Sequence, residues 1–327
     1  MEVERWSSVT RRLRSIGRVA VVTHQRPDGD ALGSAAGAVG GLRKLGVEAT
    51  VTLFEPPPAR YAFLLDSCGW QAWSDFDPKR YGAIVVLDTN ARGQLVPMVE
   101  TLDTLPPITV IDHHVSPPDV GMREIDLCLI DAQASATALL IAEWFAAADI
   151  PLDAPTATAL FTGLATDTGW FRFPSVDART LAVATRLVEA GAQPSEIFER
   201  LYQQEPIERL RLVARMLNRL ELRANGRLAV MTLRREDFER TGATGGMTED
   251  LVNEAGKLAG VEATVLLTES DDGVVRVNFR SRGQLDVASL AGQFGGGGHF
   301  RASGARVSGD FDAVTARVVD AAVAALG

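Results

Sequence analysis

The chain has 327 residues, more than one ordinary hydrophobic core needs, so its length favours two domains or one large α/β domain with an appendage. Hydrophobic residues make up 46% and charged residues 23%, values that exclude wholesale disorder. The formal net charge of −9 excludes broad electrostatic attraction for long nucleic acid, so a phosphate-bearing substrate would have to be short and held locally.

The N-terminal segment lacks the apolar run of a signal peptide. Residues 1–17 mix charged and polar residues with isolated apolar ones. No stretch of the chain reaches the roughly 18–20 apolar residues that cross a bilayer. We therefore expect a soluble, cytoplasmic protein without membrane partners.

The first half of the chain alternates short apolar runs with helical patterns. Continuous β-branched runs, typical of strands buried on both faces of a parallel sheet, occur at 19–22, 49–54, 83–87 and 108–111. Helical spacing covers 31–45 (ending before Gly46), 135–148, 155–164 and 178–190. The alternation predicts an α/β fold with a doubly wound, mainly parallel sheet and right-handed crossovers.

The pattern changes in the second half. Residues 194–222 indicate one long helical stretch rich in Arg and Glu. Strands are predicted at 227–233, 263–268, 274–280 and 305–307, helices at 249–258 and 311–326, and a glycine-rich turn precedes the last strand. We predict a first domain at 1–190, a helical linker at 191–222 and a second, smaller α/β domain at 223–327, with a cleft between the two domains.

Histidines and aspartates gather where predicted elements end. His24 begins the segment HQRPDGD after the first strand, Asp88 ends the 83–87 run, and Asp112, His113 and His114 follow 108–111 directly. The fourth segment, TDTG, closes the helical pattern of 155–164 and contains Asp167. Each aspartate alone is also an ordinary cap or turn residue, as Asp30 would be at the start of the next helix. Together they favour one site, since open α/β sheets bind ligands at the carboxyl ends of their strands.

Six of these side chains offer nitrogen or oxygen ligands to a metal. They are His24, Asp28, Asp30, Asp88, His113 and Asp167. Six ligands exceed one tetrahedral site, and structural zinc sites usually contain thiolates. A carboxylate-rich set with imidazole suits two divalent ions, Mn²⁺ or Mg²⁺, while zinc and iron remain compatible with it. Two such ions would stabilise both the entering and the departing oxygen of a phosphoryl displacement.

A run of four glycines stands before His299 near the end of the chain. Backbone N–H groups of consecutive glycines can converge on an anion, and Arg280 and Ser281 end a neighbouring predicted strand. We expect this segment to bind a phosphate or carboxylate, and a flexible hairpin is the alternative. The residues that would contribute are Arg280, Ser281, Gly296, Gly297, Gly298 and His299.

These segments resemble the motifs of a known family. Four segments of this chain resemble the four motifs of the DHH phosphoesterase superfamily: HQRPDGDALGS, LDT, IDHH and ATDTGWF. A fifth segment resembles the signature of the C-terminal domain associated with that superfamily: FGGGGHFRASG. The layout resembles the two-domain members described as nanoRNase/pAp phosphatases. Those enzymes degrade oligoribonucleotides of a few units and dephosphorylate 3′-phosphoadenosine 5′-phosphate (pAp). The resemblance spans nearly the whole chain.

The resemblance implies roles for individual residues. One metal would be held by His24, Asp28 and Asp88, and the second by Asp30, Asp88, His113 and Asp167. Asp112 would orient a neighbour, and His114 would face the scissile phosphate or help to protonate the leaving oxygen. The far phosphate or terminal nucleotide of the substrate would contact Arg280, Ser281 and His299. The family likeness also makes a homodimer plausible.

We expect a Mn²⁺-dependent, or Mg²⁺-dependent, phosphohydrolase. It would degrade short RNA or DNA oligonucleotides to nucleoside 5′-monophosphates and remove the 3′-phosphate of pAp. One alternative is a phosphodiesterase for cyclic di-AMP or linear dinucleotides, because related chains share the same two-domain core. The other is a nucleotide-binding regulator without catalysis, which would require an impaired metal site, and none is visible in the sequence.

Overall fold

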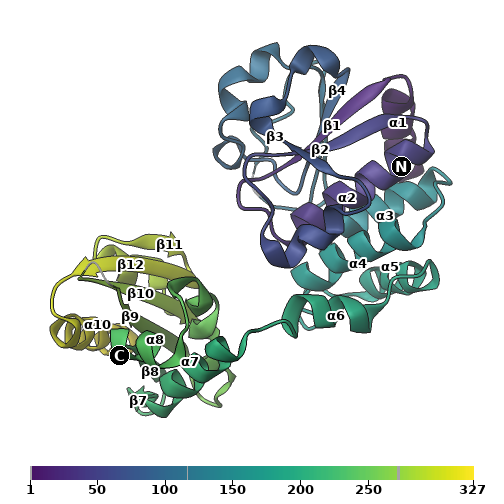
Figure 1. Ribbon diagram of the computed structural model, residues 1–327. Coiled ribbons are helices and arrows are strands. Elements are labelled where there is room, and N and C mark those ends of the chain that lie inside the picture. The colour runs from purple at the N-terminus through teal and green to yellow at the C-terminus, as the bar shows by residue number, and fades with distance from the viewer. Residues whose placement is uncertain (1, 116, 271–272) are drawn as a thin grey trace. The chain divides into compact units, whose positions relative to one another are not determined.

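The computed structural model describes residues 2–115, 117–270 and 273–327. The chain forms two compact units, Met1–Gln204 and Glu205–Gly327 (Figure 1). The division between the units falls inside the segment 191–222, which we predicted to be a linker. No helix in the described part of the chain is long and apolar enough to cross a membrane.

Unit 1 is built on a six-stranded sheet in which every pairing is parallel. The strands are β1 (Arg18–Thr23), β2 (Glu48–Leu53), β3 (Trp70–Ala72), β4 (Ala83–Leu87), β5 (Ile108–Asp112) and β6 (Leu127–Ile130). Their order is β3-β2-β1-β4-β5-β6, so the direction of winding reverses between β1 and β4. The predicted parallel sheet is confirmed. The edge strand β3 escaped prediction because it is short, partly exposed and lacks an apolar run. Strand β6 also escaped prediction, although its sequence LCLI is an apolar run as long as that of 108–111.

Both faces of this sheet are covered. The α-helices are α1 (Glu2–Arg14), α2 (Gly29–Lys44), α3 (Thr137–Ala147), α4 (Ala154–Asp167), α5 (Ala178–Glu189) and α6 (Pro194–Tyr202). They share one core with Val19, Val21 and Val85. The 3₁₀ helix η1 (Ala59–Leu65) packs on this same face through Tyr61, Leu64 and Leu65. The alternate side chains Ala20 and Val22 pack on the other face, with Trp73, Leu95 and Met98. The 3₁₀ helices of this second face are η2 (Trp73–Asp75), η3 (Pro78–Arg80), η4 (Arg92–Gln94) and η5 (Met98–Thr104).

Helices α2 and α4 pack closely because glycines face the contact. A Cβ atom at Gly33 would collide with the carbonyl oxygen of Ala159. On the facing helix, a Cβ atom at Gly163 would lie 2.8 Å from Oδ1 of Asp30. The beginning of α2 therefore lies against the end of α4, which terminates at Asp167. Close packing of these helices brings two of the predicted ligands together across 137 positions of sequence (167 minus 30).

Unit 2 is built on a mixed sheet in the order β11-β12-β10-β9-β8-β7. Its strands are β7 (Glu221–Arg223), β8 (Leu228–Leu233), β9 (Ala263–Glu269), β10 (Val274–Ser281), β11 (Gly297–His299) and β12 (Ala302–Ser308). Only the β8–β9 pairing is parallel. The helices are α7 (Ile207–Asn218), α8 (Arg235–Thr241), η6 (Gly245–Thr248), η7 (Leu251–Lys257), α9 (Val287–Gly292) and α10 (Phe311–Leu326).

Three predictions in the second half of the chain were wrong in detail. The segment 194–222, predicted as one long helical stretch, contains two helices, α6 and α7. Pro206 precedes α7, and because proline has no N–H to donate to a carbonyl oxygen one turn earlier, α6 cannot continue through it. The helix predicted at 249–258 is the 3₁₀ helix η7, which begins after Asp250 in a left-handed conformation (φ 63°). The glycine-rich turn contains the edge strand β11, which pairs with β12.

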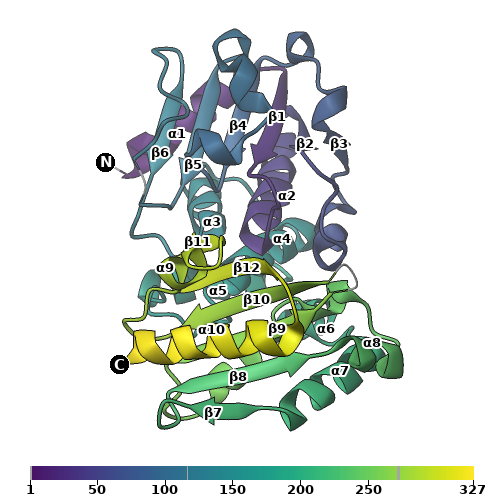
Figure 2. The same ribbon diagram turned by 90° about the vertical axis from the view of Figure 1, so that its left-hand side faces the viewer.

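The two faces of the second sheet are covered unequally. Along β10, Val275, Val277 and Phe279 are buried in a core that α9 and α10 complete, and α10 lies along the sheet (Figure 2). On the opposite face, a separate core from α7 and η7 reaches residues of β8 and β9. The β10 residues on that face, Arg276 and Asn278, are only partly buried.

The segment that follows β5 is fastened by a buried ion pair. Arg123 donates through Nε and Nη2 to the carboxylate of Asp126, at 2.9 Å each, and through its other N–H groups to the carbonyl oxygens of Leu102, Leu105 and Pro106. The Asp126 side chain is 1% exposed and also accepts the backbone N–H of Ile108, the first residue of β5. Burial alone would raise the pKa of Asp126, but these hydrogen bonds outweigh it and hold the pKa below its usual value.

Replacing Asp126 with Asn should destabilise the protein by about 3 kcal/mol at pH 7, because the substitution leaves the Arg123 guanidinium without its counter-ion. The folded-state pKa of Asp126 is depressed, so its contribution is present above the unfolded-state pKa and is lost as pH falls through the folded-state value. The difference between D126N and wild type in urea unfolding should therefore shrink below about pH 4. The exposed Asp75→Asn variant is the control, and an equal loss in D75N would contradict the assignment.

Candidate metal centre

Three neighbouring strands of unit 1 end in one row of polar residues. Thr23, Leu87 and Ile111 are register partners on β1, β4 and β5. The next residue on each strand is His24, Asp88 and Asp112, respectively. Because adjacent parallel strands lie about 4.8 Å apart, their carboxyl ends present these side chains side by side. They stand where the strand order reverses, which is the usual ligand position of an open α/β sheet.

The Asp88 backbone is held in an unusual conformation. Its φ is +62°, in the left-handed region that non-glycine residues seldom adopt and that Asp tolerates better than most. Its N–H donates to the carbonyl of Ile111, and its Oδ1 accepts a hydrogen bond from the Thr137 hydroxyl at 2.9 Å. The carboxylate is buried, with 3% of the side chain exposed, and Oδ2 lies 3.6 Å from Nε2 of His24.

Two histidines point the same ring nitrogen at the carboxylates. Nδ1 of His24 lies 2.8 Å from the carbonyl oxygen of Gln25, and Nδ1 of His113 lies 3.2 Å from that of Ala134. A carbonyl oxygen can only accept, so Nδ1 is the donor in both rings and Nε2 is the nitrogen that faces the carboxylates. A hydrogen bond at the far nitrogen is the usual way in which proteins orient a metal-binding histidine.

Nε2 of His113 faces three carboxylates. The distances are 3.4 Å to Oδ2 of Asp167, 3.6 Å to Oδ1 of Asp88 and 3.9 Å to Oδ2 of Asp30. These distances are longer than ordinary hydrogen bonds, so the ring nitrogen and the carboxylate oxygens surround a small space without closing it. The space among them suits a cation.

The start of α2 supplies the other two aspartates. Asp28 is the N-cap of α2, and its Oδ1 accepts from the N–H groups of Asp30 and Ala31. The sequence-based assignment of Asp30 as the residue that starts this helix was therefore wrong. Asp30 lies within the first turn, and its carboxylate accepts from the N–H groups of Thr137 and Ala138 at the start of α3. The carboxylate of Asp30 thus caps the N-terminus of α3 and also lies beside the cluster of proposed ligands.

The carboxyl groups repel one another. Burial first, and then the charges of Asp30, Asp28 and Asp167, raise the pKa of Asp88 well above its usual value. Burial also raises the pKa of Asp30, opposed by the charge of His113, and burial with the charge of Asp30 raises the pKa of Asp167 to about 7. A cation among these groups would remove the unfavourable interaction.

The donor set fits divalent metal ions. Three groups of side chains place ligand atoms within 4.8 Å of one another: His24 with Asp28 and Asp88, Asp88 with His113 and His114, and Asp30 with His113 and Asp167. All six predicted ligands belong to these overlapping groups. Oxygen atoms predominate and no thiolate takes part, which favours Mn²⁺ or Mg²⁺ over a structural zinc ion. Asp88 and His113 each belong to two groups, as a pair of adjacent ions would require.

Asp112 and His114 stand beside this cluster. Oδ1 of Asp112 accepts from Nδ1 of His114 at 2.8 Å, while Oδ2 is buried without a hydrogen-bond partner among the described residues. The hydrogen bond from Asp112, opposed by burial, raises the pKa of His114 above its usual value. The His114 side chain is 49% exposed, so its Nε2 is accessible to a ligand. Asp112 therefore orients His114.

Thr137 is a site residue that sequence reasoning missed. It donates its N–H to Asp30 at 2.6 Å and its hydroxyl to Asp88 at 2.9 Å, and so connects two of the proposed ligands. The only signal in the sequence is its position near the start of a predicted helix. Its partners lie 107 and 49 residues away, and no local pattern indicates such contacts.

The residues predicted to bind substrate lie in unit 2. Arg280 on β10 and His299 on β11 both pair with Ala302 on β12, so they flank one position of the sheet. The glycines before His299 have a packing role, because a Cβ atom at Gly298 would lie 2.6 Å from the carbonyl oxygen of Ala302. Ser281 is 7% exposed, and its hydroxyl has no hydrogen-bond partner in the described part of the chain.

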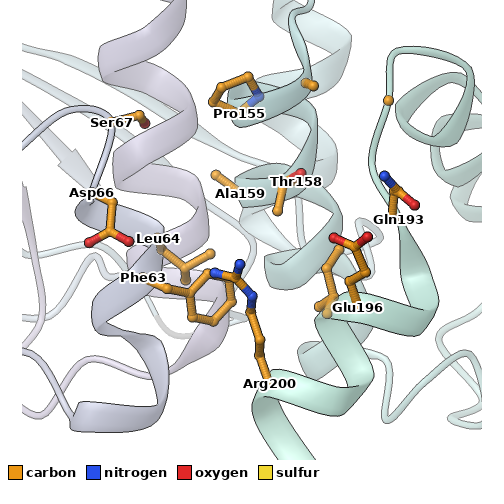
Figure 3. Close-up of a pocket in the computed structure, with 13 residues that line it drawn as sticks. Phe63, Leu64, Asp66, Ser67, Pro155, Thr158, Ala159, Gln193, Glu196 and Arg200 are labelled. Carbon is orange, nitrogen blue, oxygen red and sulfur yellow. The ribbon is translucent and has the colours of Figure 1, made fainter.

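A separate hollow of unit 1, of about 390 Å³, lies between η1, α4 and α6 (Figure 3). It contains none of the six proposed ligands. Its charged side chains have both signs, Asp66 and Glu196 with Arg200, and the Arg200 guanidinium lies 5.2 Å from the centre of the Phe63 ring. The lining favours no particular ligand.

Replacing Asp88 with Asn should abolish binding at one metal position or both, because Asp88 belongs to two of the three ligand groups. Bound Mn²⁺, measured by elemental analysis after dialysis, should fall from about two ions per chain to one or none. In EDTA the variant should melt about 2–4 °C above wild type, because Asn keeps the Thr137 hydrogen bond and removes a buried charge. Wild-type metal content in D88N would refute the centre; the exposed D75N variant is the control.

Comparison with known proteins agrees with this geometry. The family model described as "DHH family, N-terminal domain" matches residues 18–164. A second family model, "DHHA1 domain", matches residues 225–326. The bifunctional oligoribonuclease and PAP phosphatase NrnA of Thermus thermophilus is 32% identical over 312 residues, 93% of this chain and 89% of that protein. The protein of the same name from Bacillus subtilis is 29% identical over 288 residues, 87% of each chain.

A solved structure shares the fold. The crystal structure of an exopolyphosphatase-related protein from Bacteroides fragilis superposes with a TM-score of 0.84 at 23% identity, covering 98% of this chain and 95% of that one. The resemblance inferred from the four motifs and the glycine-rich signature is therefore confirmed over both units. The chain belongs to the DHH family, with a DHH domain in its first unit and a DHHA1 domain in its second.

Proposed function

We propose that this chain is a metal-dependent phosphohydrolase that degrades short oligoribonucleotides to nucleoside 5′-monophosphates and removes the 3′-phosphate of pAp. The observation that carries the proposal is the convergence of His24, Asp28, Asp30, Asp88, His113 and Asp167 at one end of the parallel sheet. The names of the Thermus and Bacillus relatives support the choice of substrates. The intact ligand set favours an enzyme over a regulator that only binds nucleotides.

Divalent ions, Mn²⁺ or Mg²⁺, bound at this centre would supply Lewis-acid stabilisation of phosphoryl oxygens and activation of water. The protein's own contribution is orientation. Asp112 holds Nδ1 of His114 and leaves Nε2 directed outward, where it can donate to a phosphate oxygen or to the leaving oxygen. The Thr137 hydroxyl orients the Asp88 carboxylate before any ion binds. The carbonyl oxygens of Gln25 and Ala134 orient the rings of His24 and His113 in the same way.

In unit 2, Arg280 and His299 would hold the part of the substrate remote from the scissile phosphate. His299 is exposed on the edge strand β11, and Arg280 is partly buried on β10. A guanidinium and an imidazole on either side of Ala302 offer several N–H donors to one phosphate or terminal nucleotide. Gly296, Gly297 and Gly298 would allow its close approach. The buried Ser281, which follows Arg280 on β10, faces the opposite side of the sheet, and we propose no contact between it and the substrate.

A substrate panel tests the proposal. With Mn²⁺ present, kcat/KM for pAp and for di- and triribonucleotides should exceed that for cyclic di-AMP by about ten-fold or more. The D88N protein is the matched negative control, because it keeps the fold and lacks the centre. Turnover of cyclic di-AMP above all linear substrates would favour the messenger phosphodiesterase, and bound Mn²⁺ without hydrolysis of any phosphoester would favour a binding protein.

Replacing His299 with Ala should lower kcat/KM for diribonucleotides by about ten-fold, since one charge-assisted or neutral donor to the substrate phosphate is lost. Mn²⁺ content should stay at the wild-type value, because His299 belongs to a different unit from the proposed ligands. Elemental analysis and initial rates on the same preparation separate the two effects. Normal turnover of dinucleotides by H299A would remove this residue from the binding site.

A further inference from the structure

Asp167 differs from the other proposed metal ligands in how its side chain is held. Each of the other five makes a hydrogen bond that orients its ligand group, the two histidines through Nδ1 and the three aspartates through a carboxylate oxygen. Within residues 2–115, 117–270 and 273–327, the Asp167 carboxylate accepts no hydrogen bond, and 32% of the side chain is exposed. Its position among the ligands must therefore come from the backbone that carries it.

The backbone just after Asp167 is in an unusual conformation. The consecutive residues Gly169, Trp170 and Phe171 are all left-handed, with φ of 55°, 57° and 60°. Glycine adopts this conformation freely, but bulky aromatic residues seldom do. Trp170 also has a buried Nε1 that finds no hydrogen-bond partner in the part of the chain that the structure describes. Two local costs thus fall on one residue, and such costs persist only where the surrounding structure holds the residue in place.

The left-handed segment closes the end of α4 around Asp167, the last residue of that helix. The N–H of Gly169 donates to the carbonyl oxygen of Thr166 at 3.0 Å, and the N–H of Trp170 donates to that of Ala165 at 2.6 Å. Both bonds span Asp167. If the segment left this conformation, both bonds would be lost and the last turn of α4 would fray, because the terminal carbonyl groups of a helix have no partner within it. The left-handed conformation and the position of Asp167 are therefore linked.

The Trp170 ring is held mainly from α6, which packs beside α4 (Figure 1). Its centre lies 5.0 Å from that of Phe198 and 5.9 Å from that of Tyr202, both in edge-to-face geometry. Phe198 and Tyr202 are one helical turn apart, and their own rings lie 5.0 Å from each other. On α4, the Phe161 ring lies 6.3 Å from Trp170. Aromatic pairs at such separations attract one another, so this cluster supplies the contacts that hold Trp170.

We propose that Trp170 is a positioning residue for Asp167. Its ring, held by the aromatic pair on α6, keeps residues 169–171 left-handed. That conformation in turn keeps the Asp167 carboxylate at the metal position that it shares with Asp30 and His113. The inference rests on the proposed function and its metal centre. It adds that one of the two metal positions depends on contacts with α6, a helix that supplies none of the six proposed ligands.

Mn²⁺ titration by calorimetry, on EDTA-treated and dialysed protein without substrate, tests the proposal. In Trp170→Ala, the dissociation constant of one ion should rise by about ten-fold or more, the usual effect of losing a group that orients a ligand. The ion held by His24, Asp28 and Asp88 should bind as in wild type. Trp170→Phe should restore much of the lost affinity, because it keeps an aromatic ring in the cluster.

A double-mutant cycle shows whether Trp170 acts through Asp167. Asp167→Asn removes the charge of the ligand and should weaken the same ion. If Trp170 acts by placing this carboxylate, D167N/W170A should bind Mn²⁺ as D167N alone does, because the two residues serve one interaction. Additive losses of affinity would show that Trp170 supports the fold in general, and they would overturn the proposal.

Two further variants keep the result decisive. Phe198→Ala removes a contact of Trp170 from outside the left-handed segment, so it should weaken the same ion to a smaller extent, and it carries the test if W170A does not fold. Trp70→Ala is the matched control, because Trp70 is a partly exposed tryptophan on β3 that belongs to none of the ligand groups. Thermal melting in EDTA identifies the folded variants. Wild-type affinity for both ions in the folded variants of Trp170 and Phe198 would overturn the proposal, and so would an equal loss in W70A.

Because the titration uses no substrate, it is independent of the proposed function. If the wild-type protein binds two Mn²⁺ ions and hydrolyses no phosphoester, the proposed function fails, while selective loss of one ion in W170A still supports the role of Trp170. If the wild-type enzyme is active and folded W170A keeps wild-type affinity for both ions, only this inference fails.

Discussion

Mutual repulsion among buried carboxylates is the constraint around which unit 1 is organised. Asp30 and Asp88 are almost fully buried and Asp167 partly so, and together they raise one another's pKa values. An apolar core would place no such groups together, and the fold tolerates them only because other interactions hold each one in place. Thr137 and the first N–H groups of α3 bind Asp30 and Asp88, and close α2–α4 packing carries Asp167 to the same point. A cation at this point converts the repulsion into attraction, so the cost of assembling the centre becomes affinity for metal.

The two units arrange their polar side chains differently because the sheet of unit 1 is parallel and the sheet of unit 2 is mainly antiparallel. A parallel sheet delivers residues from distant parts of the chain to one edge, since all its strands end there, and this suits a compact centre of ligands. An antiparallel region instead presents alternate residues along its length, every second residue on the same face. Arg276, Asn278 and Arg280 use that repeat. The parallel sheet therefore gathers side chains at one point, and the antiparallel region sets them out along a line.

Much of this arrangement could be predicted from the sequence, for physical reasons. Strands buried on both faces have continuous apolar runs, which is why β1, β2, β4 and β5 could be recognised, and the polar residue after each run marks the ligand edge. Short edge strands such as β3 and β11 have no such run. The role of Thr137 and the pairing of Arg276 with Arg306 depend on contacts between residues far apart in sequence, so no local pattern reveals them. The break between α6 and α7 had a visible signal in Pro206, which the Arg- and Glu-rich helical pattern obscured.

Asp30 has two functions that no single substitution can separate. Its carboxylate accepts the opening N–H groups of α3, and it also faces the centre, so occupancy by an ion and the integrity of α3 share one group. Whatever binds the folded state and not the unfolded state shifts the folding equilibrium in proportion to its free concentration. The supply of divalent metal would consequently affect the fraction of this protein that is folded as well as its activity, and loss of metal would expose more of it to proteolysis.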